Sequence, residues 1–342
     1  MTPHHPDSGG TGRTWPLRAL LPLLVGFTSC HAAPHSALPP MHTLSSDQLQ
    51  VEVMDPHSPD RYYRGSRFSP VATVLQVRMA GHRFLFAPEQ HDPQTENGGL
   101  AMEFDIGTEP NPPPPHFTDA ATGEGFLKIG VGVLKKETDP LYKFYTSYPV
   151  LQPAITTVDW AADRARFQQT CAGVAGYAYR LDAEVRVVSN EVTLRYRLTN
   201  TGTKPFSTEQ YAHNFFVIDD QPVTPGAYEV QFPYDFTAKI PKPVIQQQGR
   251  KLVLVGEITP KVKAAQAFVH PPAHMKGRDT VTVRQPATGL QIVATLSRPA
   301  NSTTVHMGPL YLCPEQFVRI DLQPGETADW ERVYAFEFSP DK

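Results

Sequence analysis

Apolar and polar residues alternate most regularly between residues 177 and 198, in two runs separated by Ser189-Asn190-Glu191. A period of two places successive side chains on opposite faces of an extended strand. Two such runs joined by a short polar turn predict an antiparallel β-hairpin with one buried face. The apolar positions are Tyr177, Tyr179, Leu181, Ala183, Val185 and Val187 in the first run, and Val192, Leu194, Tyr196 and Leu198 in the second.

Shorter runs of the same kind recur along the chain. Beyond the N-terminal segment, no stretch carries apolar residues at helical spacing for three turns. We therefore expect an all-β fold, built as a large antiparallel β-sandwich or a barrel. The predicted strands lie at residues 71–79, 83–86, 127–134, 251–255, 280–283, 290–296, 317–322 and 330–338.

The proline content favours the same fold class. The chain has 35 prolines in 342 residues, roughly twice the ordinary ~5%. A proline inside a helix costs about 3 kcal/mol, so helical bundles are excluded. The proline-rich stretches 110–115 and 222–225 are interpreted as loops between strands. Residues 46–342 are predicted to form one β-sandwich domain, although two stacked sandwiches fit the same pattern.

The first 30 residues have the features of a signal peptide. Arg13 and Arg18 precede an apolar run at 19–27, which is far shorter than the ~20 residues of a membrane-spanning helix. The sequence Phe27-Thr28-Ser29-Cys30 resembles a bacterial lipobox, which predicts lipidation at Cys30. Cleavage after Ala32 or Ala33 is the alternative. We expect residues 31–45 to be a proline-rich tether and the protein to be exported, as a periplasmic or outer-membrane lipoprotein.

Charge and cysteine content narrow the possible partners. With 31 Lys+Arg against 34 Asp+Glu, the formal net charge is -3, which excludes the strong basic excess of nucleic-acid-binding domains. The only expected membrane contact is a lipid anchor at Cys30. The other two cysteines, Cys171 and Cys313, are interpreted as free buried thiols or as one disulfide. No pair of cysteines has metal-finger spacing, and no metal is expected.

Two segments carry candidate chemistry. Residues 206–220 place His213 among aromatic residues, where a histidine is either a core residue or a proton donor and acceptor beside a bound sugar. Near the C-terminus, residues 311–316 read Tyr-Leu-Cys-Pro-Glu-Gln and include Glu315. The turn at 322–326, Leu-Gln-Pro-Gly-Glu, follows and leads into the last predicted strand.

These segments resemble the galactose mutarotase (aldose 1-epimerase) superfamily. That family has an Asn-His-x-Tyr-Phe type motif after a hairpin, and residues 212–216, Ala-His-Asn-Phe-Phe, are similar to it, with Ala and Phe in place of Asn and Tyr. Its catalytic glutamate lies in a Leu-Glu-x-Gln type segment before a Leu-x-Pro-Gly-Glu turn. Glu315 and Gln316 resemble this segment without the intervening residue. The resemblance implies a galactose mutarotase-like β-sandwich.

The same resemblance implies acid/base chemistry on a sugar. Glu315 is expected to take the proton of the C1 hydroxyl while the His213 imidazolium protonates the ring oxygen. The ring then opens, the aldehyde turns, and the ring closes on its other face. Neither a metal nor a cofactor is needed, so we expect no cofactor and a sugar or glycan as the ligand.

Further residues are expected around the sugar. The family has an early sugar-binding arginine, for which Arg67 is the candidate, and a second histidine before paired glycines, for which His91 before Gly98-Gly99 is the candidate. Tyr211 and Asn214 flank His213 and are expected to bind substrate. Glu103, together with Asp105 and Lys128, either lines the same site or forms a structural salt bridge, since charges in apolar surroundings must be paired or functional.

Two other interpretations remain open at this point. One is a non-catalytic glycan-binding lipoprotein, and the other is a polysaccharide lyase or hydrolase on the same fold, with Tyr211 as a further acid/base residue. The anomer-converting enzyme and the glycan-binding protein differ in whether His213 and Glu315 face each other across a gap the size of one pyranose ring. The lyase or hydrolase predicts a long open groove.

Overall fold

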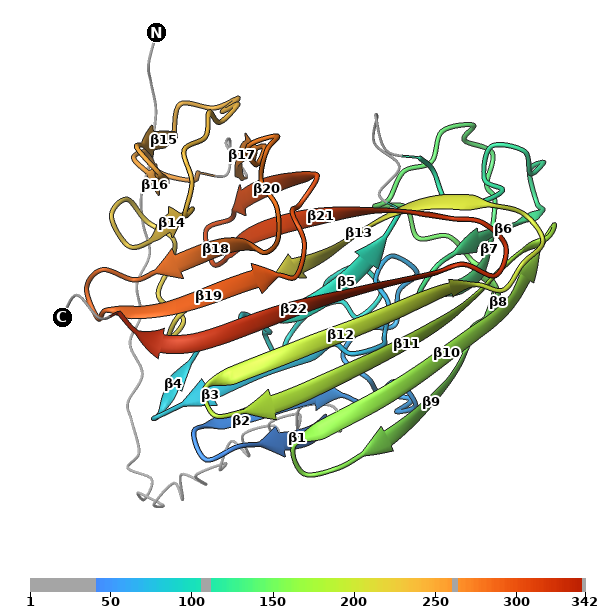
Figure 1. Cartoon of the computed structure of the whole chain (residues 1–342), viewed down its shortest axis with the longest axis horizontal. Coiled ribbons are helices and arrows are strands. Elements are labelled where there is room, and N and C mark those ends of the chain that lie inside the picture. The colour runs from blue at the N-terminus through green and yellow to red at the C-terminus, as the bar shows by residue number, and fades with distance from the viewer. Residues whose placement is uncertain (1–40, 106–111, 260–263, 340–342) are drawn as a thin grey trace, which may run out of the picture. The chain divides into compact units, whose positions relative to one another are not determined.

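The alternating runs of the sequence form β-strands that pair in antiparallel order, as the computed structural model in Figure 1 shows. The structure describes residues 41–105, 112–259 and 264–339, and these residues contain strands, turns and loops but no helix. Among them, therefore, no helix has the length and apolar character needed to span a membrane. The described residues all fall within the folded unit 38–342.

One sheet has nine strands and carries the candidate chemistry. Its order is β1-β2-β3-β5-β13-β21-β20-β17, and β4 pairs with β3 at the side. The strands are β1 (Met41–Ser45), β2 (Leu49–Met54), β3 (Val74–Met79), β4 (His82–Arg83), β5 (Leu100–Phe104), β13 (Phe206–Asn214), β17 (Ala265–Val269), β20 (Ser302–Met307) and β21 (Leu312–Leu322).

A second sheet has ten strands in the order β15-β16-β14-β18-β19-β22-β12-β11-β10-β9. These are β9 (Ile155–Trp160), β10 (Arg164–Val174), β11 (Tyr177–Val188), β12 (Glu191–Asn200), β14 (Glu229–Gln231), β15 (Ile245–Gln248), β16 (Lys251–Leu254), β18 (Asp279–Arg284), β19 (Leu290–Leu296) and β22 (Thr327–Phe338). A small third sheet contains β6 (Gly125–Lys128), β7 (Gly132–Lys135) and β8 (Val150–Pro153).

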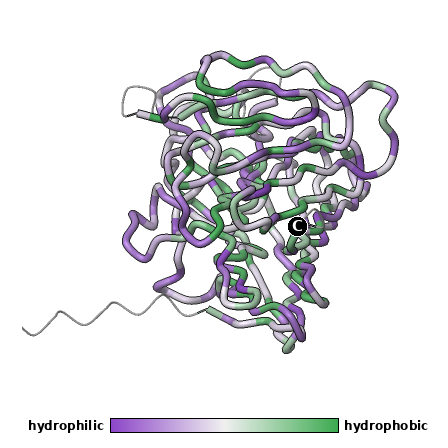
Figure 2. The backbone as a smooth tube through the Cα atoms, turned by 90° about the vertical axis from the view of Figure 1, so that its left-hand side faces the viewer, coloured by the Kyte–Doolittle hydropathy of each residue, from purple (hydrophilic) through white to green (hydrophobic). Residues whose placement is uncertain are grey.

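The two large sheets share one hydrophobic core. Its buried side chains come from alternate positions of both sheets, such as Leu100 and Met102 of β5 and Leu194 and Leu198 of β12. Figure 2 shows the corresponding alternation of hydrophobic and hydrophilic residues along the strands. Burial of one face of each sheet against the other is the defining arrangement of a β-sandwich, and the predicted all-β antiparallel sandwich is confirmed.

The predicted hairpin is β11 and β12, which pair from Val188↔Glu191 to Tyr179↔Asn200. Two predicted strands differ from the structure. Of residues 83–86, only Arg83 lies in a strand, at the end of β4, and Leu85 forms an isolated bridge with Phe216. Residues 127–134 contain the end of β6, a turn and most of β7, which pair with each other. Gly130 in that turn has a φ of 86°, a conformation that glycine adopts without steric cost. An apolar run that crosses a tight turn reads in sequence as one strand.

The predicted start of the folded domain also differs from the structure. Residues 41–45, assigned to the tether, form β1 and pair with β2, and Leu44 is buried in the core. The predicted signal peptide, Cys30 and residues 31–40 of the tether lie outside the described residues. Of the proline-rich stretches, residues 112–115 and 222–225 lie in loops between strands.

Candidate active site

Two neighbouring strands place His213 and Glu315 on one face of the nine-stranded sheet. The β13–β21 register runs from Phe206↔Leu322 to Gln210↔Val318, and the bridge Phe216↔Leu312 continues it. The same register places His213 directly opposite Glu315. Because side chains alternate along a strand, both side chains point away from the sandwich core, on the face opposite Phe206 and Leu322.

The two side chains are in direct contact. His213 Nε2 lies 3.2 Å from Glu315 Oε1, and only 12% and 10% of the respective side chains are exposed. Burial, together with the charge of Arg67 and the neighbouring His306, holds the pKa of His213 well below its ordinary 6.5. Burial raises the pKa of Glu315 to about 8, against a lowering by Arg67.

These shifts give the pair one proton near neutral pH. Burial disfavours the charged form of each group, so the contact is a carboxylic acid beside a neutral imidazole and not an ion pair. The predicted imidazolium and carboxylate therefore do not describe the ligand-free site. Transfer of the proton from Glu315 to His213 converts one form into the other. In both forms one partner is an acid and the other a base.

Arg67 is held beside this pair by a buried network. Its Nε donates to Glu103 Oε2 at 2.7 Å, and its Nη2 donates to the Tyr211 hydroxyl at 3.0 Å. Tyr211 in turn donates to Glu103 Oε2. Burial alone would lower the pKa of Arg67, but Glu103 and Tyr211 outweigh it and raise that pKa above its ordinary value. Arg67 is therefore a fixed positive charge in the site.

Aromatic rings enclose the Arg67 guanidinium. Its central carbon lies 4.5 Å from the ring centroid of Phe68 and 4.6 Å from that of Phe144. Both distances fall within the range of cation–π attraction. Phe68 also meets the His213 ring edge-on at 5.9 Å, so one aromatic side chain contacts both polar groups.

Glu103 joins this network to Lys128, as one of the two sequence interpretations expected. Lys128 Nζ lies 3.7 Å from Glu103 Oε1, and both side chains are fully buried. Lys128 also donates to the backbone carbonyl oxygens of Phe104 and Asp105. Burial lowers the pKa of Lys128, against the pull of Glu103 and Asp105. Glu103 thus holds Arg67 in place through an ion pair and has no exposed surface with which to contact a ligand.

Asn214 does not belong to this site. It is fully buried, its amide nitrogen donates to the Pro314 carbonyl at 2.7 Å, and its side-chain oxygen accepts from the Tyr334 hydroxyl at 2.9 Å. As the neighbour of His213 in a strand, it points to the opposite face, into the sandwich. The prediction that Asn214 binds substrate is wrong because strand alternation separates it from His213.

His91 lies in the loop between β4 and β5. Its ring stacks on Tyr62 at 3.8 Å, and its Nε2 is 2.7 Å from the Tyr62 carbonyl oxygen. Tyr62 belongs to the small aromatic cluster that also contains Phe68 and Phe215. His91 is thereby anchored at the edge of the cluster, and within the described part of the chain no contact links it to His213, Glu315 or Arg67.

Three neighbours of the pair were not predicted. His306 of β20 lies 6.3 Å from the His213 ring, Tyr311 lies 6.5 Å from it, and Phe144 covers Arg67. A strand assignment at 302–307 would have placed His306 on the face of Glu315, since His306 pairs with Cys313. Nothing in the sequence marks Phe144, which lies in a loop 77 residues after Arg67 and 69 residues before His213.

Cys313 is the remaining polar neighbour. Both Cys171 and Cys313 are free and buried, so the interpretation as free thiols is confirmed. Cys171 lies in the sandwich core and Cys313 in the aromatic cluster of the site. Ligand atoms of His213, Cys313 and Glu315 all lie within 4.8 Å of one another. The sequence argument against metal considered only cysteine pairs and did not see this combination.

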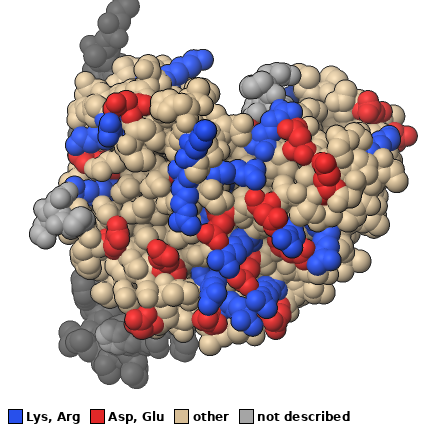
Figure 3. All heavy atoms as spheres, viewed as in Figure 1, with Lys and Arg blue, Asp and Glu red and all other residues tan. Residues whose placement is uncertain are grey.

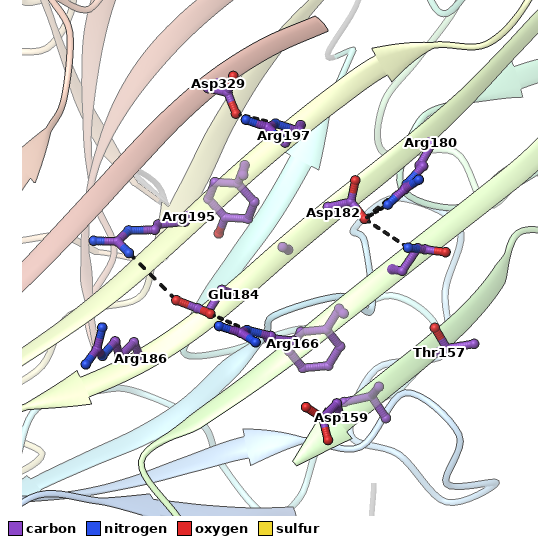
Figure 4. Close-up of a pocket in the computed structure, with 15 residues that line it drawn as sticks. Thr157, Asp159, Arg166, Arg180, Asp182, Glu184, Arg186, Arg195, Arg197 and Asp329 are labelled. Atoms are coloured by element: carbon purple, nitrogen blue, oxygen red, sulfur yellow. Dashed lines mark hydrogen bonds and ion pairs between the residues drawn. The ribbon is translucent and has the colours of Figure 1, made fainter. Parts of the chain in front are cut away.

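A separate hollow of about 780 Å³ lies on the outer face of the ten-stranded sheet. Figure 3 shows opposite charges intermingled on this face, and Figure 4 shows the pairs Arg166–Glu184, Arg180–Asp182 and Arg197–Asp329 along the strands. These exposed charges are already paired with one another. The hollow therefore lacks the desolvated acid/base groups of a catalytic site, and we place the candidate chemistry at His213 and Glu315.

Comparison with known protein families and with curated proteins finds no match to this chain. Solved structures do match its fold. A galactose mutarotase-like protein from Lactobacillus casei has a TM-score of 0.52 and 11% identity, over 87% of this chain and 100% of the other. The fold is galactose mutarotase-like.

Two further structures agree with this assignment. A galactose 1-epimerase from Lactobacillus acidophilus matches with a TM-score of 0.52 and 10% identity, over 87% of this chain and 94% of its own. An aldose epimerase homologue from C. elegans matches with a TM-score of 0.51 and 12% identity, over 88% and 99% of the two chains. At these identities the likeness establishes the galactose mutarotase-like fold and leaves activity to the site itself.

Proposed function

We propose that this protein is an exported carbohydrate-active enzyme that interconverts the anomers of a sugar, as an aldose 1-epimerase does. The observation that carries the proposal is that His213 and Glu315, an acid/base pair, lie opposite each other on one sheet face and beside the positive charge of Arg67. Two of the structures with the same fold, a galactose 1-epimerase and an aldose epimerase homologue, support the same reaction class.

The chemistry needs one acid and one base beside the same sugar. One partner takes the proton of the C1 hydroxyl while the other protonates the ring oxygen, and ring closure reverses the two transfers. Each positioned proton donor or acceptor contributes typically ~10²–10⁴ in rate. The single proton of the His213–Glu315 pair supplies both roles without a net change in charge. Arg67 would donate a hydrogen bond to a sugar hydroxyl beside the pair.

Access to the pair is narrow in the ligand-free state. Because about a tenth of each side chain is exposed, some of the surrounding aromatic side chains have to move when a sugar ring binds. Phe144 is the candidate for this movement, since it covers Arg67 from a loop and not from a strand. Export, with a lipid anchor at Cys30, remains part of the proposal from the N-terminal sequence.

Polarimetry of freshly dissolved α-glucose and α-galactose tests the reaction. The purified protein should accelerate the approach to rotational equilibrium for at least one sugar. Glu315→Gln and His213→Asn should each lose ~10²–10⁴ of that acceleration. Asp329→Asn, on the outer face of the other sheet, is the matched control and should keep it. Acceleration that survives both site variants would refute the acid/base assignment.

Non-catalytic glycan binding is the second candidate function. It is favoured by one observation, since His213 and Glu315 touch each other and leave no gap of sugar size between them. Under this alternative, a panel of sugars shows binding in calorimetry but no acceleration in polarimetry. Loss of binding in a Phe144→Ala variant would assign the ligand to the same face of the sheet.

A further inference from the structure

Three different metal-binding side chains meet on the outer face of β13 and β21. Cys313 and Glu315 are two residues apart on β21 and so share a face, and the β13–β21 register, continued by the bridge Phe216↔Leu312, places His213 opposite Glu315. Their ligand atoms, a sulfur, a nitrogen and an oxygen, lie within 4.8 Å of one another. The backbones that carry them are paired strands, which hold the three side chains in a fixed relation.

The ring of His213 has one nitrogen, Nε2, in contact with Glu315, whereas the other, Nδ1, is buried without a hydrogen bond in the described residues. The Cys313 thiol is fully buried and free, and it forms no disulfide with Cys171. In the neutral imidazole one ring nitrogen carries the proton and the other has a free lone pair, so a proton on Nδ1 leaves Nε2 available as a ligand beside Glu315.

The distances suit a small cation with tetrahedral geometry. Bonds of about 2.0–2.3 Å from Zn²⁺ to nitrogen, oxygen and sulfur place neighbouring ligand atoms about 3.3–3.8 Å apart. The His213–Glu315 separation of 3.2 Å already has this size. The widest separation is at most 4.8 Å, so the ligand atoms would approach one another by about 1 Å when the cation binds.

We propose that His213, Cys313 and Glu315 bind one divalent cation of the Zn²⁺ class, with the fourth position left to water. Thiolate, imidazole and carboxylate together are the ligand set that Zn²⁺ uses in proteins, whereas Mg²⁺ and Ca²⁺ prefer oxygen ligands alone. A site with three protein ligands and one open position is the arrangement of zinc sites that are accessible to small molecules.

Binding of the cation requires the thiol of Cys313 and the carboxyl group of Glu315 in their deprotonated forms, so protons are released as the cation enters. The charge of Arg67 opposes the cation, but its ion pair with Glu103 compensates that charge.

Occupation would affect the proposed reaction. A cation that uses His213 and Glu315 as ligands removes both from proton transfer, so Zn²⁺ would inhibit anomer interconversion. This consequence rests on the proposed function, whereas the metal site itself does not. Direct metal binding is therefore the test, because its failure and the failure of sugar chemistry are seen in separate measurements.

The experiment uses the purified protein after removal of metal with a chelator. Titration with Co²⁺ should give one bound ion per chain and a thiolate-to-cobalt absorption band, and Zn²⁺ should displace the cobalt. Cys313→Ser should abolish the band and weaken Zn²⁺ binding in calorimetry by at least about tenfold, since even the outer partners of metal ligands contribute ~10–100-fold. Cys171→Ser is the matched control and should keep both signals.

A second variant guards against misfolding of Cys313→Ser. Glu315→Gln keeps the shape of the side chain and should weaken Zn²⁺ binding while the thiolate band with Co²⁺ remains at higher metal concentration. A Co²⁺ spectrum without a thiolate band in the wild-type protein, as surface histidines alone would give, overturns the proposal. A band that survives Cys313→Ser, or that is lost in Cys171→Ser, overturns it as well.

Discussion

The outer faces of the two large sheets hold the same kind of ion pair in opposite surroundings. Arg67 Nε lies 2.7 Å from a Glu103 carboxylate that has no exposed surface, and Arg195 Nε lies 2.6 Å from Glu331 on a face where 55% of the Arg195 side chain is exposed. The bond lengths are nearly equal. What differs is the loss of unfolding free energy when one partner is removed. Water can solvate the remaining charge of the exposed pair, but it cannot reach the buried pair in the same way.

The surroundings also decide what each face can do. On the ten-stranded sheet, charges alternate with apolar residues in regular strands and pair with their neighbours across the strands. On the nine-stranded sheet, loops cover the outer face, and the groups beneath them are desolvated. Desolvation produces the shifted pKa values of His213 and Glu315, so the covered face is the one suited to proton transfer.

Removing Glu103 should produce the largest difference between the two faces. Glu103→Gln leaves Arg67 and Lys128 in a buried site without their carboxylate, which costs about 3–5 kcal/mol of unfolding free energy. Glu331→Gln on the exposed face is the matched control and should cost less than about 1 kcal/mol. Urea unfolding of both variants measures the difference, and equal losses would contradict this account of the buried network.

Glu315 should make stability depend on pH in a way that no surface carboxylate does. Its pKa is about 8 in the folded protein against 4.5 as its ordinary value. The folded state therefore holds a proton that the unfolded state has released between these two values, and the contribution of Glu315 to stability falls as pH rises from 4.5 to 8. Glu315→Gln removes this dependence.

The stability of Glu315→Gln relative to the wild type should accordingly increase with pH, by at most about 1.4 kcal/mol per pH unit. The increase begins near pH 4.5 and levels off above pH 8. Thermal unfolding of both proteins from pH 5 to pH 9 checks the sign. A relative stability that stays constant over this range would show that Glu315 titrates like an exposed carboxylate.

Tyr211→Phe should have a smaller effect. The change removes a hydroxyl that donates to Glu103 and accepts from Arg67, and it leaves the ring stacked on Phe317. Loss of hydrogen bonds to buried charged groups costs about 1–3 kcal/mol. Thr199→Val on the exposed face loses a hydrogen bond to Thr327 and is the comparison, with a change near zero in the same unfolding assay.

Sequence reasoning identified the fold class because long strands such as β11 and β12 alternate strictly between buried and exposed positions. It found His213 and Glu315 through two motif-like segments, but it assigned Asn214 to the same site. Neighbouring residues of a strand point to opposite faces of the sheet. A motif of consecutive residues therefore includes side chains, such as His213 and Asn214, that lie on different faces.

Other parts of the site depend on contacts that a single sequence does not reveal. Phe144 reaches Arg67 from a loop, and Lys128 reaches Glu103 from the short strand β6. The protonation of the pair follows from burial by surrounding segments, which no local pattern encodes. Residue types indicated the acid/base chemistry, and tertiary packing determines the protonation state of the residues.

The most direct test of the central claim is a titration of the Glu315 carboxyl carbon by ¹³C NMR in the ligand-free protein. The shared proton predicts a midpoint near pH 8, and the resonance should be absent from the Glu315→Gln spectrum. A midpoint near 4.5 would mean that Glu315 is an ordinary carboxylate at neutral pH. In that case, the buried acid/base pair proposed for this protein would not exist.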